Sequence, residues 1–85
     1  MKVYETSKFQ KLRKKIESAA EKEALKQAVI SVVAKPLSGK KLKGELKDLR
    51  RHRYFVGGQE RRLIYKVQKE TIFLLSFGPR EGIYK

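Results

Sequence analysis

Arginine dominates the residues that could do chemistry in this sequence, and Arg51 and Arg53, two positions apart, are the first candidates. On a β-strand, side chains two residues apart point to the same face of the sheet. Neighbouring guanidinium groups repel each other unless an anion lies between them, and arginine binds phosphate in a bidentate manner. The pair therefore predicts a phosphate-binding site, although an edge strand protected from aggregation by charge would have the same pattern.

Three further residues could join that pair. Arg62 begins an apolar run, which predicts either a site residue or a surface salt bridge to Glu60 or Glu81. Arg80 follows a Gly-Pro turn after the most apolar segment, a position where sites are often built. Tyr84 could stack on a nucleic-acid base or simply pack on the sheet.

His52 is the only histidine, so it is the only side chain whose ordinary pKa lies near neutrality. Strand alternation directs it away from Arg51 and Arg53, toward the helices or a sheet edge, so a structural role competes with acid–base chemistry. The sequence contains no metal-ligand cluster, phosphate loop or nucleophile triad. Phosphoryl transfer in RNA suits such a site, because the substrate's own 2′-hydroxyl attacks and arginines neutralise the developing charge. Arginine cannot supply the proton transfers, since it stays protonated.

The charge of the chain points to a polyanionic partner. The 85 residues include 22 Lys and Arg against 9 Asp and Glu, a net charge of +13. Nucleic acid, an acidic protein and an anionic membrane are the usual partners of such a surface. Residues 36–66 carry ten basic and three acidic side chains, a net of +7. The residues predicted to contact RNA outside the site are Lys40, Lys41, Lys43, Lys47, Arg50 and Arg61.

The composition and length of the chain indicate its cellular compartment and the number of its domains. The sequence has no cysteine, no secretory signal at its N-terminus and no apolar run long enough to span a bilayer. We therefore expect a soluble cytoplasmic protein without a membrane partner. The length supports one hydrophobic core, so residues 1–85 are predicted to form a single domain.

The N-terminal half is predicted to be a helical hairpin. One continuous helix is excluded because the apolar residues around Phe9 and those around Leu25 fall on opposite sides at 100° per residue. A break near Ser18 removes this conflict. Ser7 and Ser18 are each followed three residues later by Gln or Glu, which predicts helix starts at both serines. Pro36 ends the second helix.

The remaining chain is predicted to form a basic connector over residues 37–48, followed by three strands. Gly57-Gly58 and Lys69-Glu70 are the turns between them. The last strand, almost wholly apolar, should lie inside the sheet. The predicted elements are a short edge strand over 2–5, helices over 7–17 and 19–34, and strands over 49–56, 60–68 and 71–77. The fold class is α+β, with a helical hairpin packed on one face of a small, mostly antiparallel sheet.

The segments KKLKGELKDLRRHRY, RRLIYKV and IFLLSFGPREGIYK, behind a strand and a helical hairpin, resemble the RelE/ParE superfamily of toxins from type II toxin–antitoxin systems. For the RelE branch, the resemblance implies metal-independent and cofactor-independent cleavage of mRNA in the ribosomal A site. The 2′-hydroxyl attacks, leaving a 2′,3′-cyclic phosphate and a 5′-hydroxyl.

The resemblance also assigns roles. Arg62 and Arg80 match the phosphate-binding arginines of the family, and Tyr84 matches the tyrosine that stacks on or activates the substrate. Arg51 and Arg53 stand where the RelE branch has a basic pair that is often lysine. With arginine there, Tyr84 or His52 must assist the proton transfers, or catalysis rests on electrostatics and positioning alone.

Three functions stay open from the sequence. The first is a ribosome-associated mRNA endoribonuclease, which binds ribosome and mRNA through its basic faces. The second is a ParE-like inhibitor of DNA gyrase that cleaves nothing, and the third is an RNA-binding domain without catalysis. Either toxin implies an acidic antitoxin that folds on binding.

Overall fold

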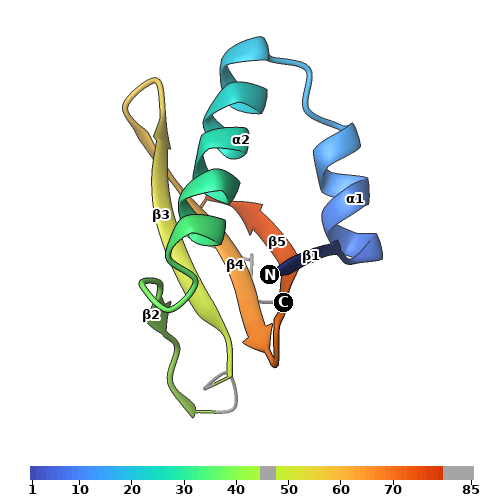
Figure 1. Cartoon of the computed structure of the whole chain (residues 1–85). Helices are drawn as coiled ribbons and strands as arrows, with labels where there is room; N and C mark the ends of the chain where they lie inside the picture. Colours follow the sequence, from blue (N-terminus) through green and yellow to red (C-terminus); the bar gives the residue numbers. More distant parts are fainter. Residues whose placement is uncertain (45–47, 80–85) are drawn as a thin grey trace.

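The computed structural model describes residues 1–44 and 48–79, which form two helices and a five-stranded sheet (Figure 1). The elements along the chain are β1 (Lys2–Glu5), α1 (Ser7–Lys14), α2 (Ala19–Ala34), β2 (Lys40–Lys41), β3 (Arg50–Val56), β4 (Gln59–Gln68) and β5 (Thr71–Gly78). Within these residues, no helix is both long and apolar enough to cross a membrane.

Helix α1 begins one residue earlier than predicted. Thr6, not Ser7, is the N-cap, because the Thr6 hydroxyl accepts a hydrogen bond from the Phe9 amide at 3.3 Å. The same hydroxyl donates to the carbonyl of Leu74 in β5 at 2.8 Å. Thr6 thus fixes the start of the helix to the sheet, which Ser7 is not placed to do. The helix also ends at Lys14 rather than at residue 17.

The predicted break at Ser18 is confirmed. Ser18 caps α2, and its hydroxyl accepts a hydrogen bond from the Glu21 amide at 3.2 Å. The helix ends at Ala34, shortly before Pro36, as expected. Figure 1 shows α1 and α2 running in opposite directions, so the two segments form the predicted hairpin.

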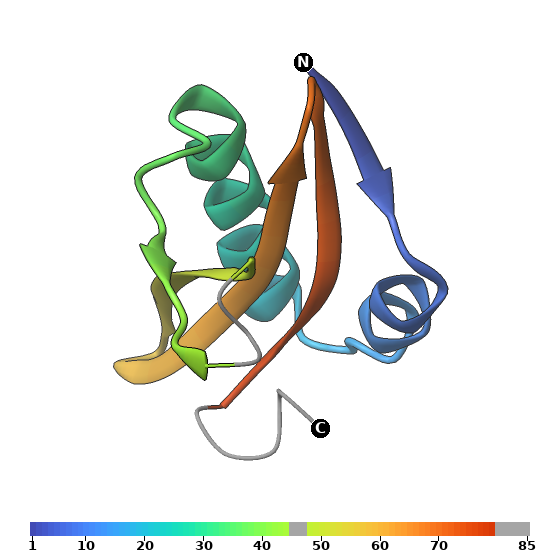
Figure 2. The same ribbon diagram turned by 90° about the horizontal axis from the view of Figure 1, so that it is seen from below.

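The sheet has the strand order β1-β5-β4-β3-β2. Only β1 and β5 pair in parallel, so the sheet is mostly antiparallel as predicted, and β1 is an edge strand. Figure 2 shows β1 and β2 at opposite edges. Strand β2 was predicted as part of a connector; its two residues are too few to show any alternation of apolar and polar side chains.

Two tight turns set the register of β3, β4 and β5. Gly57 and Gly58 have φ values of 56° and 82°, which glycine adopts without steric cost, and they place Val56 opposite Gln59. Lys69 has a φ of 56° in the second turn, an uncommon conformation for a residue with a Cβ.

The helices cover one face of the sheet. Helix α2 packs on β3 and β4, and α1 packs on β5. Phe9 contacts Phe77 edge to face, with ring centroids 5.2 Å apart. The core between helices and sheet consists of Phe9, Ile16, Leu25, Ala28, Val32, Tyr54, Leu63, Tyr65, Ile72 and Leu74.

Candidate nucleic-acid interface

The helix-free face of the sheet carries a compact group of arginines. Leu63 belongs to the core, so its neighbour Arg62 points to the opposite face. Arg53 lies directly opposite Arg62 in the β3–β4 ladder, and Arg51 shares its face. Lys40 of β2 pairs with Arg51 and so extends the group to the edge of the sheet. We call Lys40, Arg51, Arg53 and Arg62 the arginine face.

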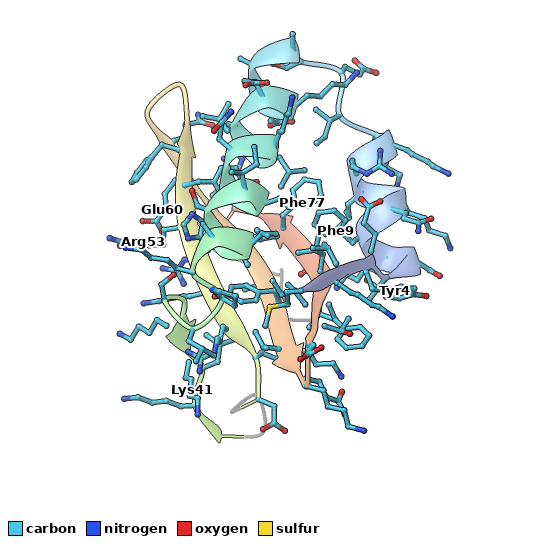
Figure 3. All side chains as sticks on the ribbon, viewed as in Figure 1. Tyr4, Phe9, Lys41, Arg53, Glu60 and Phe77 are labelled. Carbon is cyan, nitrogen blue, oxygen red and sulfur yellow. The ribbon has the colours of Figure 1, made fainter. Side chains whose placement is uncertain are left out.

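Glu60 neutralises part of this face. One oxygen of its carboxylate lies 3.3 Å from Nη1 of Arg53, and the other lies 3.2 Å from Nε of Arg62. Figure 3 shows Glu60 beside Arg53. The Arg62 side chain is almost fully buried, whereas that of Arg53 is 57% exposed. The ion pair between Arg62 and Glu60 that the sequence suggested is therefore present, inside the arginine face. Sequence reasoning missed the bridge to Arg53, which the diagonal position across the ladder would have indicated.

A hollow of about 410 Å³ lies at the edge of β3 beyond the short strand β2. His52, Arg51 and Arg53 line it together with Lys40. By strand alternation His52 points to the helix side, opposite Leu63, as the sequence predicted. Burial lowers the pKa of the His52 imidazole below its ordinary value of 6.5, so the ring is neutral at pH 7.

Two predicted RNA-binding arginines make contacts within the protein instead of joining the arginine face. Nη1 of Arg50 donates to the carbonyls of Leu37 at 3.1 Å and Gly39 at 2.9 Å. Arg61 forms an ion pair with Glu21 of α2 at 3.5 Å, and its side chain is 19% exposed. Both arginines lie on the helix side of the sheet and hold the connector and α2 against it.

A buried tyrosine of β4, Tyr65, holds the segment before β2 against the sheet by two hydrogen bonds. The hydroxyl of Tyr65 donates to the carbonyl of Pro36 at 2.8 Å and accepts from the amide of Gly39 at 3.0 Å. Tyr65 is fully buried. These bonds fix the backbone just before Lys40, and thereby position that lysine on the arginine face.

The other predicted site residues divide into two groups. Lys41 and Lys43 are exposed on and after β2, and Lys41 pairs with Arg50, away from the arginine face. Lys47, Arg80 and Tyr84 lie outside the described residues.

A second surface feature is an apolar groove of about 660 Å³ between α1 and α2. Its lining includes the core side chains of Phe9, Leu25 and Leu74, and Ile30 on its rim is 50% exposed. The cationic residues that line it are Arg13, Lys14, Lys22 and Lys26. Glu5 also lines the groove and is paired with Arg13, so the lining combines apolar side chains with a net positive charge from the three lysines.

Comparison with known proteins identifies the family. A model of the ParE-like toxins of type II bacterial toxin–antitoxin systems matches residues 3–85. The chain belongs to this family. A comparison with curated proteins returned no match.

Solved structures agree with this assignment of the toxin. It resembles the intact Escherichia coli RelBE toxin–antitoxin complex with a TM-score of 0.74 and 22% identity, covering 94% of this chain and 96% of that one. The isolated E. coli RelE toxin gives a TM-score of 0.73 at 24% identity, covering 94% and 84%. A copper-bound mutant toxin from Helicobacter pylori gives 0.62 at 22% identity, covering 94% of each chain. At these identities the similarity shows a shared α+β fold.

The arginine face of this toxin has the donors needed to bind a phosphate group. Arg62 is rigid because it is buried and paired, whereas Arg53 is free to adjust. A rigid and an adjustable guanidinium on one face can bind two oxygens of the same phosphate. Such donors stabilise the extra charge of a pentacoordinate phosphorus without a proton transfer of their own.

Proposed function

We propose that this type II toxin is a ribosome-dependent endoribonuclease that cleaves mRNA by metal-independent attack of the 2′-hydroxyl. The observation that carries the proposal is the position of Arg53 directly opposite Arg62 on the helix-free face, beside Arg51. Such a protein acts in the cytoplasm, where mRNA is translated.

The proposed roles follow from burial and charge. Arg62, fixed in place, binds the scissile phosphate, and Arg53 closes on it from the opposite strand. Arg51 and Lys40 contact a neighbouring phosphate and set the direction of the RNA strand. From the family resemblance, Arg80 adds a further phosphate contact, and Tyr84 stacks on a base or assists proton transfer.

The proton transfers need a group other than arginine. His52 lines the same hollow as Arg51 and Arg53, although strand alternation directs its side chain to the helix side, so it can assist only where the RNA enters that hollow. Burial lowers the pKa of its imidazole and keeps the ring neutral, the form that accepts a proton. His52 and Tyr84 are therefore the two candidates for acid–base assistance, beside catalysis by positioning alone.

The basic residues outside the arginine face supply affinity without sequence preference. Lys41, Lys43 and Lys47 would contact the phosphates of ribosomal RNA, with the salt dependence that counterion release causes. Arg50 and Arg61 would contribute mainly through the field of the whole surface.

The antitoxin partner is proposed from the groove between the helices. A solved relative is an E. coli complex of toxin with antitoxin. The groove on this toxin combines apolar side chains with a net positive charge, which complements an amphipathic helix with acidic flanks. An acidic antitoxin would also offset the charge of +13.

A ParE-like inhibitor of DNA gyrase is the alternative function. Two points favour it: the matching family model is that of the ParE-like toxins, and β3 carries arginines where, by the family resemblance, the RelE branch often has lysines. In that case the arginine face would bind a protein, and no RNA would be cut. A non-catalytic RNA-binding domain would bind without cleaving.

Primer extension on a translated mRNA after brief induction tests the proposal. The wild type should produce new ends in phase with codons, which disappear when translation is blocked. Arg62→Ala, Arg80→Ala and Tyr84→Ala should lose them, whereas Lys11→Ala, an equal loss of charge on an exposed position of α1, should keep them. Intact mRNA in growth-arrested cells would contradict the proposal and lead to a gyrase supercoiling assay.

A further inference from the structure

Glu60 occupies an unusual position for an acidic residue. It is two residues before Arg62 on β4, shares its face, and lies diagonally across from Arg53 on β3. Oε1 faces Arg53 and Oε2 faces Arg62, at 3.3 and 3.2 Å. One carboxylate therefore bridges two guanidiniums that belong to different strands.

This bridge resolves an electrostatic conflict. Two like charges directly opposite each other across a ladder destabilise the sheet. The Glu60 carboxylate offers one oxygen to each guanidinium, and a phosphodiester presents its two non-bridging oxygens in a similar way. A phosphate and a carboxylate cannot share that position, because both are anionic.

We propose that the Glu60 carboxylate occupies the place between Arg53 and Arg62 that a phosphate of the bound RNA takes, so that RNA must displace it. The identity of the anion as RNA rests on the proposed function. Glu60 thereby acts as a built-in competitor that lowers affinity for the ligand while it stabilises the unbound protein.

Exposure indicates which groups move. The side chain of Glu60 is 29% exposed and that of Arg53 57% exposed, whereas that of Arg62 is 8% exposed. Glu60 and Arg53 can therefore swing toward solvent while Arg62 stays in place. The incoming phosphate would meet the exposed Arg53 first and reach Arg62 as Glu60 swings away.

Binding measurements on the full chain test this inference with two anions. The first is a single-stranded 2′-O-methyl RNA, which has no free 2′-hydroxyl and cannot be cleaved; the second is inorganic pyrophosphate, monitored by thermal shift. The variants are Glu60→Gln, which removes the charge, and Glu60→Asp, which keeps it on a side chain too short to bridge both arginines. Glu23→Gln, on an exposed position of α2, is the matched control for net charge.

We expect Glu60→Gln to bind both anions about fivefold more tightly than the wild type. Glu60→Asp should shift affinity in the same direction by a smaller factor with net charge unchanged. Glu23→Gln should change affinity by less than about twofold, since its charge is distant and screened. Without ligand, Glu60→Gln should melt at a lower temperature than the wild type, and pyrophosphate should recover the difference.

The outcomes separate this inference from the proposed nuclease. If neither Glu60 variant binds either anion more tightly than Glu23→Gln does, the inference is wrong, even when the wild type cleaves mRNA. If pyrophosphate binds more tightly to the Glu60 variants but no form of the protein binds the free RNA, the role of Glu60 as a competitor for anions is supported, and the primer-extension assay alone decides the nuclease proposal. Should Glu60→Gln not fold, Glu60→Asp alone decides by the same comparison.

Discussion

The hydroxyl of Tyr65 and the amide of Gly39, 26 residues apart in sequence, are joined by a buried hydrogen bond of 3.0 Å. The same hydroxyl donates to Pro36, so one side chain satisfies two backbone groups of the connector. A Cβ on Gly39 would lie 2.2 Å from the Tyr65 oxygen, closer than any real contact. The connector, and with it Lys40 on the arginine face, is placed by this pair.

Removing the hydroxyl tests that role. Tyr65→Phe should lower the free energy of unfolding by about 1–3 kcal/mol, because the buried Gly39 amide and the partly buried Pro36 carbonyl lose their partner. Gly39→Ala should be destabilising as well, since the tyrosine ring must move. Denaturant titration measures both, with Tyr4→Phe at an exposed position as the control. Equal stability of Tyr65→Phe and the wild type would show that water replaces the hydroxyl at no cost.

Alkaline pH should destabilise the protein through Tyr54. Desolvation by burial raises the pKa of its phenol from 10.0 to about 12, against the opposing effect of Arg61. The folded state thus favours the protonated phenol, so the stabilisation is complete below pH 10 and is lost as pH rises toward about 12. Burial also raises the pKa of the Tyr65 phenol, so ultraviolet titration of tyrosinate should show late absorbance from both residues. The part that Tyr54→Phe removes is the contribution of Tyr54.

Acid pH should also destabilise the protein, through His52. Burial lowers its pKa below 6.5, so the unfolded state binds the proton more readily than the folded state does. The resulting stability is present above pH 6.5 and falls as pH drops through the lowered pKa. An NMR titration of the single imidazole should give a midpoint below 6.5, and His52→Asn should flatten the acid limb of the stability profile. A midpoint above 6.5 would indicate an anionic neighbour instead.

The groove between the helices should determine neutralisation by the antitoxin. Ile30→Asp places a negative charge on the rim of an apolar surface meant for an acidic helix, so binding should weaken about tenfold or more. Val33→Asp is the matched control, because Val33 is similarly exposed on α2 but does not line the groove. Titration of each toxin with the purified antitoxin measures the difference. Equal affinity of the antitoxin for both variants would mean that it binds a surface other than this groove.

The sequence was sufficient for the fold wherever a local signal was strong. The opposed apolar phases around Ser18 placed the hairpin correctly, and the two-residue Gly57-Gly58 turn is enough to put Arg53 opposite Arg62. Ser7 failed as the N-cap because Thr6 is tied to Leu74, a contact that no local pattern reveals.

The candidate site was predicted less completely than the fold. The shared face of Arg51 and Arg53 followed from alternation, and so did the opposite direction of His52. The same alternation would have placed Arg50 and Arg61 on the helix side. They were nevertheless predicted to contact RNA because of their positive charge. Glu60 was seen only as a partner of Arg62, because its reach to Arg53 depends on the register between strands.

The two arginines of the opposed pair should differ in their effect on cleavage. Arg62→Lys keeps the buried charge but loses the planar donor geometry, so the cleavage rate should fall about 100-fold with RNA affinity nearly unchanged. Arg53→Ala should lower the rate about tenfold and reduce the slope of log affinity against log salt by about 0.7, the contribution of one phosphate contact to single-stranded RNA. Arg61→Ala on the helix side of the same strand is the control, and should alter stability more than the salt slope. Arg53→Ala and Arg61→Ala each remove one positive charge, so a cleavage rate that falls equally in these two variants would mean that net charge, not the opposed pair, drives the reaction.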